Sequence, residues 1–225
     1  MNKTNIEWCD YTWNPVVGCR RACWYCYARK IYKRFYPYEN FSDIHLHPER
    51  LKDPFFVKKP SKIFVGSMTE IMDERIGTEY LDEIFNIAEN LPRHTFMFLT
   101  KCTQAYSRLT DVPDNCYMGV TETGEDPPYI KMTRIAHLIK KSPGKVKFVS
   151  FEPLLRETAH LIKEGINWII IGGLAGQYKD FKYKPNPQHV TDILAAARHL
   201  GIPVFIKDNL RWRPELLIKY RNFPD

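Results

Sequence analysis

The chain has 225 residues, of which 44% are hydrophobic and 26% charged, and its formal net charge is +7. This composition is that of a globular protein and excludes an intrinsically disordered or fibrous chain. No apolar run approaches the roughly 18 to 20 residues that span a bilayer, and no apolar core follows Lys3. We therefore expect a cytoplasmic protein without a signal peptide or contact with a membrane.

Short apolar strands recur along the chain. The expected strands are Tyr11–Val17, Lys62–Val65, Thr95–Leu99, Tyr117–Val120, Val146–Val149, Trp168–Ile171 and Pro203–Ile206. Near-continuous runs of β-branched and aromatic residues are typical of strands buried on both faces, as in a parallel sheet.

Stretches of helical length alternate with these strands. The expected helices are Tyr27–Phe35, Thr78–Asn90, Pro128–Lys141 and Pro187–Leu200, with shorter ones at Gln104–Leu109 and Arg156–Lys163. Strict alternation predicts an α/β fold with parallel strands and right-handed crossovers. We expect a single domain over residues 1–225 that forms a full or partial (β/α) TIM-like barrel. An open doubly wound sheet is the alternative.

Polar residues or glycines follow nearly every expected strand directly. They are Ser67 with Glu70, Lys101, Glu122, Glu152, the pair Gly172 and Gly173, and Lys207 with Asp208. In barrels the carboxyl ends of the strands meet at one mouth, where active sites are built. The pattern predicts such a mouth here, although loops are polar in any case.

Three of the six cysteines lie within eight residues, after the first expected strand, in the spacing C-x3-C-x2-C. Thiolates are the usual ligands of iron–sulfur clusters, so Cys19, Cys23 and Cys26 can bind three irons of a [4Fe–4S] cluster. The fourth iron is then open to a non-protein ligand, as a catalytic centre requires. One rival is a zinc site, which usually needs four ligands, and His45 and His47 belong to a different segment. The other rival is a loop of cysteines that bind no ligand.

The cysteine spacing, with Tyr25 directly before the last cysteine, resembles the signature of the radical SAM superfamily. The wider chain resembles a phage-associated family of three-cysteine-motif proteins long carried as a domain of unknown function. The resemblance rests on Ile6–Trp8, Thr12–Pro15, Gly18–Cys19, Cys26–Ala28, Phe98–Lys101, Gly119–Val120 with Glu122, Phe148–Leu154 and Ile171–Gly173. This chain departs from those relatives at Cys9 and Cys102, and in its shorter spacing between the first two cysteines.

The resemblance implies that the three cysteines bind the cluster and that S-adenosylmethionine (SAM) binds its fourth iron. Reductive cleavage of SAM would then give a 5′-deoxyadenosyl radical that abstracts hydrogen from a substrate. Residues implied to contact SAM are Tyr25, Ser67, Thr69, Glu70, Glu122, Gly172 and Gly173. Residues proposed to contact substrate or to transfer a proton are Lys101, Glu152 and Lys207. A reductant such as flavodoxin or ferredoxin and a partner protein are further implied.

The substrate is expected to be a nucleic acid or a nucleotide, in repair or modification. The basic helix Ala28–Arg34 suits binding of a phosphate backbone, and Lys58–Lys62 adds further basic residues. Arg211 and Arg213 have Trp212 between them, which suits stacking on nucleotides. Two alternatives stay open. The same chemistry could act on a peptide or small metabolite, or the cluster could belong to a non-enzymatic sensor or nucleic-acid-binding module.

Overall fold

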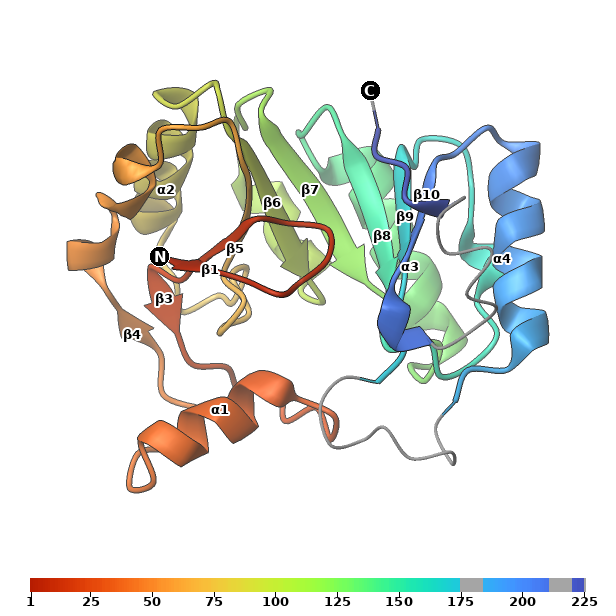
Figure 1. Cartoon of the computed structure of the whole chain (residues 1–225), viewed down its shortest axis with the longest axis horizontal. Coiled ribbons are helices and arrows are strands. Elements are labelled where there is room, and N and C mark those ends of the chain that lie inside the picture. The colour runs from red at the N-terminus through yellow and green to blue at the C-terminus, as the bar shows by residue number, and fades with distance from the viewer. Residues whose placement is uncertain (175–183, 211–219, 225) are drawn as a thin grey trace. The chain divides into compact units, whose positions relative to one another are not determined.

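A computed structural model describes residues 1–174, 184–210 and 220–224. The chain divides into two compact units. The first comprises Met1–Met118 with Pro143–Lys145, and the second comprises Gly119–Ser142 with Val146–Asp225. Figure 1 shows the elements of both units, which are described in turn.

The first unit is built on parallel strands. Its strands are β1 (Asn2–Lys3), β2 (Tyr11–Trp13), β3 (Val16–Val17), β4 (His45–Leu46), β5 (Lys62–Val65) and β6 (Thr95–Thr100), and its helices are α1 (Tyr27–Phe35) and α2 (Thr78–Glu89). Strand β7 (Cys116–Thr121) begins in this unit, and the sheet order within it is β1-β2-β5-β6-β7. Strands β2, β5 and β6 pair in parallel, whereas β1 pairs antiparallel with β2 and β3 with β4.

The second unit repeats this architecture. It holds the end of β7, then β8 (Lys147–Phe151), β9 (Trp168–Ile171) and β10 (Val204–Ile206), with helices α3 (Pro128–Lys141) and α4 (Pro187–His199). Strand β9 pairs in parallel with both β8 and β10. All four residues of β9 are buried, as expected for a strand covered on both faces.

The expected helices are confirmed to within one residue at each end, because their apolar residues repeat with helical spacing and because Pro128 and Pro187 begin α3 and α4. The expected strand Tyr11–Val17 is interrupted between β2 and β3, at Asn14 and Pro15. The two shorter expected helices, Gln104–Leu109 and Arg156–Lys163, correspond to 3-10 helices at Thr103–Arg108 and Ala159–Leu161.

The α/β fold with mostly parallel strands is thus confirmed. Within each unit the described strands form an open sheet, so a closed barrel is not seen in either, and a partial TIM-like arrangement is the consistent description. The expectation of one domain over residues 1–225 stays a prediction. Among the described residues, no helix has the length and apolar character needed to cross a membrane.

Candidate functional site

The cysteine loop is fixed in the first unit by the residues around Gly18. The Gly18 N–H donates to the Met68 carbonyl at 3.0 Å, and the Thr69 hydroxyl donates to the Gly18 carbonyl at 2.6 Å. The Cys19 N–H donates to the Phe41 carbonyl at 2.7 Å. Cys19 is therefore held from two sides before the loop turns toward the other cysteines.

The second and third cysteines lead directly into α1. The Cys26 N–H donates to the Cys23 carbonyl at 3.1 Å, and Cys26 itself is the N-cap of the helix. Its Sγ accepts a hydrogen bond from the Arg29 N–H at 3.3 Å. Cys26 is therefore fixed at the amino end of the helix, with its Sγ hydrogen-bonded to a first-turn N–H.

The three thiols are free cysteines that lie close enough to interact. The pKa of Cys19 is raised to about 11, chiefly by burial and to a smaller extent by the neighbouring Glu70, Cys23 and Cys26, while a backbone hydrogen bond from Arg21 lowers it. All three are partly exposed. The cost of burying a negative charge therefore favours the thiol form of Cys19.

Thiolates are the usual protein ligands of iron–sulfur clusters, and binding of a cluster by these three cysteines stays a prediction. Among the described residues, no group of three His, Cys, Asp or Glu side chains could hold a metal ion, whereas a zinc site needs its ligands to converge on one point. A cubane presents a separate iron to each thiolate, so its cysteines need not converge in that way. Cys19 and Cys26 also pack against the small apolar cluster Val17, Ala28, Tyr32 and Phe41, which shields one side of the loop.

Two of the predicted residues meet beside the loop. The Lys101 ammonium lies 5.7 Å from the centroid of the Tyr25 ring, and Trp24 packs edge-on against the same ring at 5.3 Å. Cys102, the next residue along, accepts a hydrogen bond from the Arg21 guanidinium at 3.0 Å. Two contacts therefore join the end of β6 to the cysteine loop. Lys101 contacts the Tyr25 ring, and Arg21 of the loop contacts Cys102.

Ser67, Thr69 and Glu70, which follow β5 and were predicted to contact SAM, form hydrogen bonds within the first unit. The Ser67 hydroxyl donates to Asn14 Oδ1 at 3.1 Å, and the Thr69 hydroxyl donates to Gly18 as described above. Glu70 is buried, and its carboxylate accepts the Lys101 N–H at 2.9 Å and a short hydrogen bond from the Thr100 hydroxyl. These contacts position the loop, and binding of SAM by these side chains stays a prediction.

In the second unit, Glu122 follows β7 and is fully buried. Its carboxylate forms a short ion pair with Arg134 of α3 and accepts the N–H groups of Thr123 and Gly124 at 3.0 and 3.1 Å. Arg134 in turn contacts Asp126 at 2.9 Å. The carboxylate of Glu122 thus has internal partners, and its predicted contact with SAM is untested.

The residues predicted after β8, β9 and β10 come together. Lys207 forms a short ion pair with Glu152, whose Oε1 also accepts the Asn209 amide at 3.3 Å. A Cβ at Gly172 would lie 2.8 Å from the Glu152 carboxyl carbon, and one at Gly173 would lie 2.6 Å from the Asn209 carbonyl oxygen. These glycines are therefore required for close packing around the ion pair.

The sequence interpretation missed three residues that organise these sites: Asn14, Arg21 and Asn209. Asn14 directly follows β2, and Asn209 lies two residues beyond Lys207. Asn14 was missed because it lay inside the expected strand Tyr11–Val17, whereas the observed strand β2 ends at Trp13. The predicted basic residues at 211–213 lie outside the described residues.

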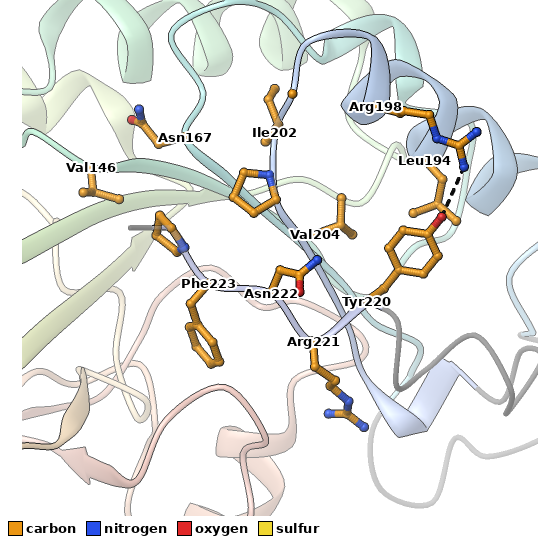
Figure 2. Close-up of a pocket in the computed structure, with 13 residues that line it drawn as sticks. Val146, Asn167, Leu194, Arg198, Ile202, Val204, Tyr220, Arg221, Asn222 and Phe223 are labelled. Atoms are coloured by element: carbon orange, nitrogen blue, oxygen red, sulfur yellow. Dashed lines mark hydrogen bonds between the residues drawn. The ribbon is translucent and has the colours of Figure 1, made fainter.

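A pocket of about 980 Å³ opens at the other end of the second unit's strands, and Figure 2 shows its lining. Val146, Asn167 and Pro203 line it, each next to the amino end of β8, β9 or β10. The Arg198 guanidinium donates to the Tyr220 hydroxyl at 3.3 Å within it. Ligands of parallel α/β sheets bind at the carboxyl ends of the strands, so this pocket is not the candidate site.

No curated protein matches this chain. A solved structure, a cysteine-to-serine mutant of spore photoproduct lyase, superposes with a TM-score of 0.60 at 9% sequence identity. The match covers 91% of this chain and 78% of that one, and at this identity it shows a shared fold. A sequence-family match extends over residues 3–222, so the chain belongs to the family described as "Protein of unknown function (DUF5131)".

Proposed function

We propose that this protein is a radical SAM enzyme in which Cys19, Cys23 and Cys26 hold a [4Fe–4S] cluster. When bound and reduced, cluster and SAM supply a 5′-deoxyadenosyl radical for hydrogen abstraction. The observation that carries the proposal is the loop itself, with three free thiols in C-x3-C-x2-C spacing fixed by backbone hydrogen bonds at its first and last cysteine.

The likeness of fold supports the proposal. Spore photoproduct lyase is a radical SAM enzyme, and the superposition extends over nine-tenths of this chain. The likeness concerns the fold and leaves the substrate open. The resemblance to a phage-associated family also stays a prediction.

The chain's own residues prepare the loop for this chemistry. The Arg29 N–H donates to Cys26 Sγ, and hydrogen bonds to the sulfurs are one means by which proteins tune such clusters. The apolar cluster under Cys19 and Cys26 excludes water from one side. Lys101, held beside Tyr25, is the cation of this unit that we propose for contact with an anionic substrate.

In the second unit, Glu152 and Lys207 form the proposed pair for substrate binding or proton transfer. Both side chains are largely shielded from solvent, at 19% and 10% exposure, so a proton passing between them is protected from bulk water. The absence of a side chain at Gly172 lets the Glu152 carboxylate lie against the end of β9, where we propose that the pair meets the substrate.

We propose a nucleic acid or nucleotide as substrate, because the net charge is +7 and cations and aromatic residues are interleaved after the cysteine loop. The proposal includes an electron donor such as flavodoxin or ferredoxin. A peptide or small-metabolite substrate would leave the loop chemistry unchanged. A sensor would bind the cluster without cleaving SAM.

The test is anaerobic reconstitution with iron and sulfide, reduction by dithionite, addition of SAM and chromatographic assay of 5′-deoxyadenosine. The wild type is expected to form it, and Cys23→Ala is expected to form none. Cys9→Ala, which removes a cysteine of another segment, is the matched control and is expected to retain activity. A reconstituted protein that never cleaves SAM would overturn the proposal in favour of a sensor.

A further inference from the structure

Helix α1, directly after the cysteine loop, carries an exposed aromatic surface. We call the α1 surface the set Trp24, Tyr27, Ile31, Phe35, Tyr36 and Tyr38, whose exposed fractions run from 38% to full exposure. The opposite side of the helix is anchored, because Ala28 and Tyr32 are buried against Val17 and Phe41. The helix therefore buries one side against these residues and exposes the other to solvent.

The exposed side chains form a row. Tyr27, Ile31 and Phe35 are four residues apart, which places them about 6 Å apart along one side of the helix at 1.5 Å per residue. The Tyr27 hydroxyl donates to the Ser67 carbonyl at 2.9 Å, so the end of the row next to the cysteines is fixed. The row thus begins at the cysteine loop and runs away from it.

The same segment is basic throughout. Residues 20–38 contain Arg20, Arg21, Arg29, Lys30, Lys33 and Arg34 and no acidic residue. Arg29 has a structural role, since it donates to the Cys19 carbonyl at 3.3 Å and lies 5.3 Å from the Phe41 ring centroid. Lys33 and Arg34 are exposed in the last turn, and the Arg34 guanidinium lies 5.9 Å from the Phe35 ring centroid.

We propose that the α1 surface binds single-stranded nucleic acid and guides it to the cysteine loop, an inference that rests on the proposed function and names its substrate class. Unpaired bases offer flat faces for stacking on aromatic rings, and the phosphates are met by the cations. A duplex keeps its bases stacked inside and offers the rings no such face. A second copy of the chain would bring the same positive charge against it and be repelled.

The experiment measures binding of a fluorescent single-stranded 12-mer and of the matching duplex by anisotropy, over a range of salt concentrations. Phe35→Ala is expected to weaken single-strand binding about tenfold, as loss of one stacked base predicts. Its matched control is Phe56→Ala, because Phe35 and Phe56 are 68% and 69% exposed. Circular dichroism of each variant confirms that it is folded.

A second pair of variants tests the charges. Lys33→Gln/Arg34→Gln is expected to reduce the slope of log affinity against log salt by about 1.4, for two lost phosphate contacts. Lys140→Gln/Lys141→Gln makes the same change in the last turn of α3 and is expected to leave the slope nearly unchanged. Equal effects of the two pairs would mean that net charge alone drives binding and would overturn the proposal.

The outcomes separate this inference from the proposed function. If SAM is cleaved but Phe35→Ala leaves oligonucleotide binding unchanged, the α1 surface does not bind nucleic acid, and the proposed radical SAM function is retained. If SAM is never cleaved but the α1 variants alone lose oligonucleotide binding, the α1 surface binds nucleic acid, and the proposed radical SAM function is wrong. Tighter binding of the α1 surface to anionic lipid vesicles or to an acidic electron carrier than to the 12-mer would also overturn the inference.

Discussion

At the scale of single residues, the cysteine loop depends on Gly18. Its φ of 110° is a backbone conformation that side chains disfavour, and a Cβ there would lie 1.8 Å from the Asp43 carbonyl oxygen. Gly18→Ala is therefore expected to lower the free energy of unfolding by about 3 kcal/mol or more, measured by urea titration.

Gly201 provides the control for this substitution. Its φ of 67° is also left-handed, but a Cβ there would meet no atom within 4 Å. Gly201→Ala is expected to lower the free energy of unfolding by only about 1 to 2 kcal/mol, the cost of holding alanine in a left-handed backbone conformation. Equal losses for the two variants would show that the close approach to Asp43 does not constrain the loop.

A buried histidine makes stability depend on pH. Burial lowers the pKa of His94 below its usual 6.5, and Arg93 adds to this, while Nε2 contacts the Val57 carbonyl at 3.2 Å. As the pH falls through about 6.5, the unfolded chain takes up a proton here that the folded chain does not, so stability decreases. It stops decreasing below the folded pKa, where both states are protonated.

The measurement is urea unfolding at about pH 7.5 and about pH 5.5 for the wild type and His94→Gln, which can still donate to Val57. The wild type is expected to lose more stability than the variant between these two conditions. The same loss in both proteins would assign the pH dependence to other groups.

Residue types could be assigned to strand ends from the sequence, but their partners could not. Glu70 and Glu122 were expected to face a ligand, and the structure gives both carboxylates partners within their own units. The partner Arg134 lies on the buried face of α3 beside Ile135 and Leu138, and its residue type does not predict burial there. Side-chain pairing depends on three-dimensional contacts that periodicity does not encode.

At the scale of elements, one ion pair joins the end of β7 to α3. Arg134 is 2% exposed and pairs with the fully buried Glu122. Arg134→Met would leave a buried carboxylate without its cation, at an expected cost of about 3 to 5 kcal/mol in the free energy of unfolding. Adding Glu122→Gln removes the unpaired charge, so the double variant should recover part of that stability. A double variant no more stable than the single one would contradict this.

The helices were the most predictable elements. Their apolar spacing is regular, and Pro128 and Pro187 occupy first turns, where the missing N–H is harmless. Strand boundaries were less predictable, because Pro15 removes a donor within an otherwise apolar run. A short helix was expected at Gln104–Leu109, but over so few residues the apolar spacing does not distinguish an α-helix from the 3-10 helix found at Thr103–Arg108.

At the scale of the whole molecule, strand and helix alternation predicted parallel pairing correctly. Closure of a barrel depends on strand tilt and stagger, which no local pattern specifies, and each unit has an open sheet. The predicted residues divide between the units, with the cysteine loop and Lys101 in the first and Glu152 and Lys207 in the second.

The central claim is that the three cysteines bind a [4Fe–4S] cluster with one iron open to SAM. Iron analysis and electron paramagnetic resonance of the anaerobically reconstituted, reduced protein test it most directly, with and without SAM. We predict about four irons per chain and a spectrum that changes when SAM is added, with the signal lost in Cys19→Ala. Tightly bound zinc in place of iron, or a cluster whose spectrum ignores SAM, would contradict the account.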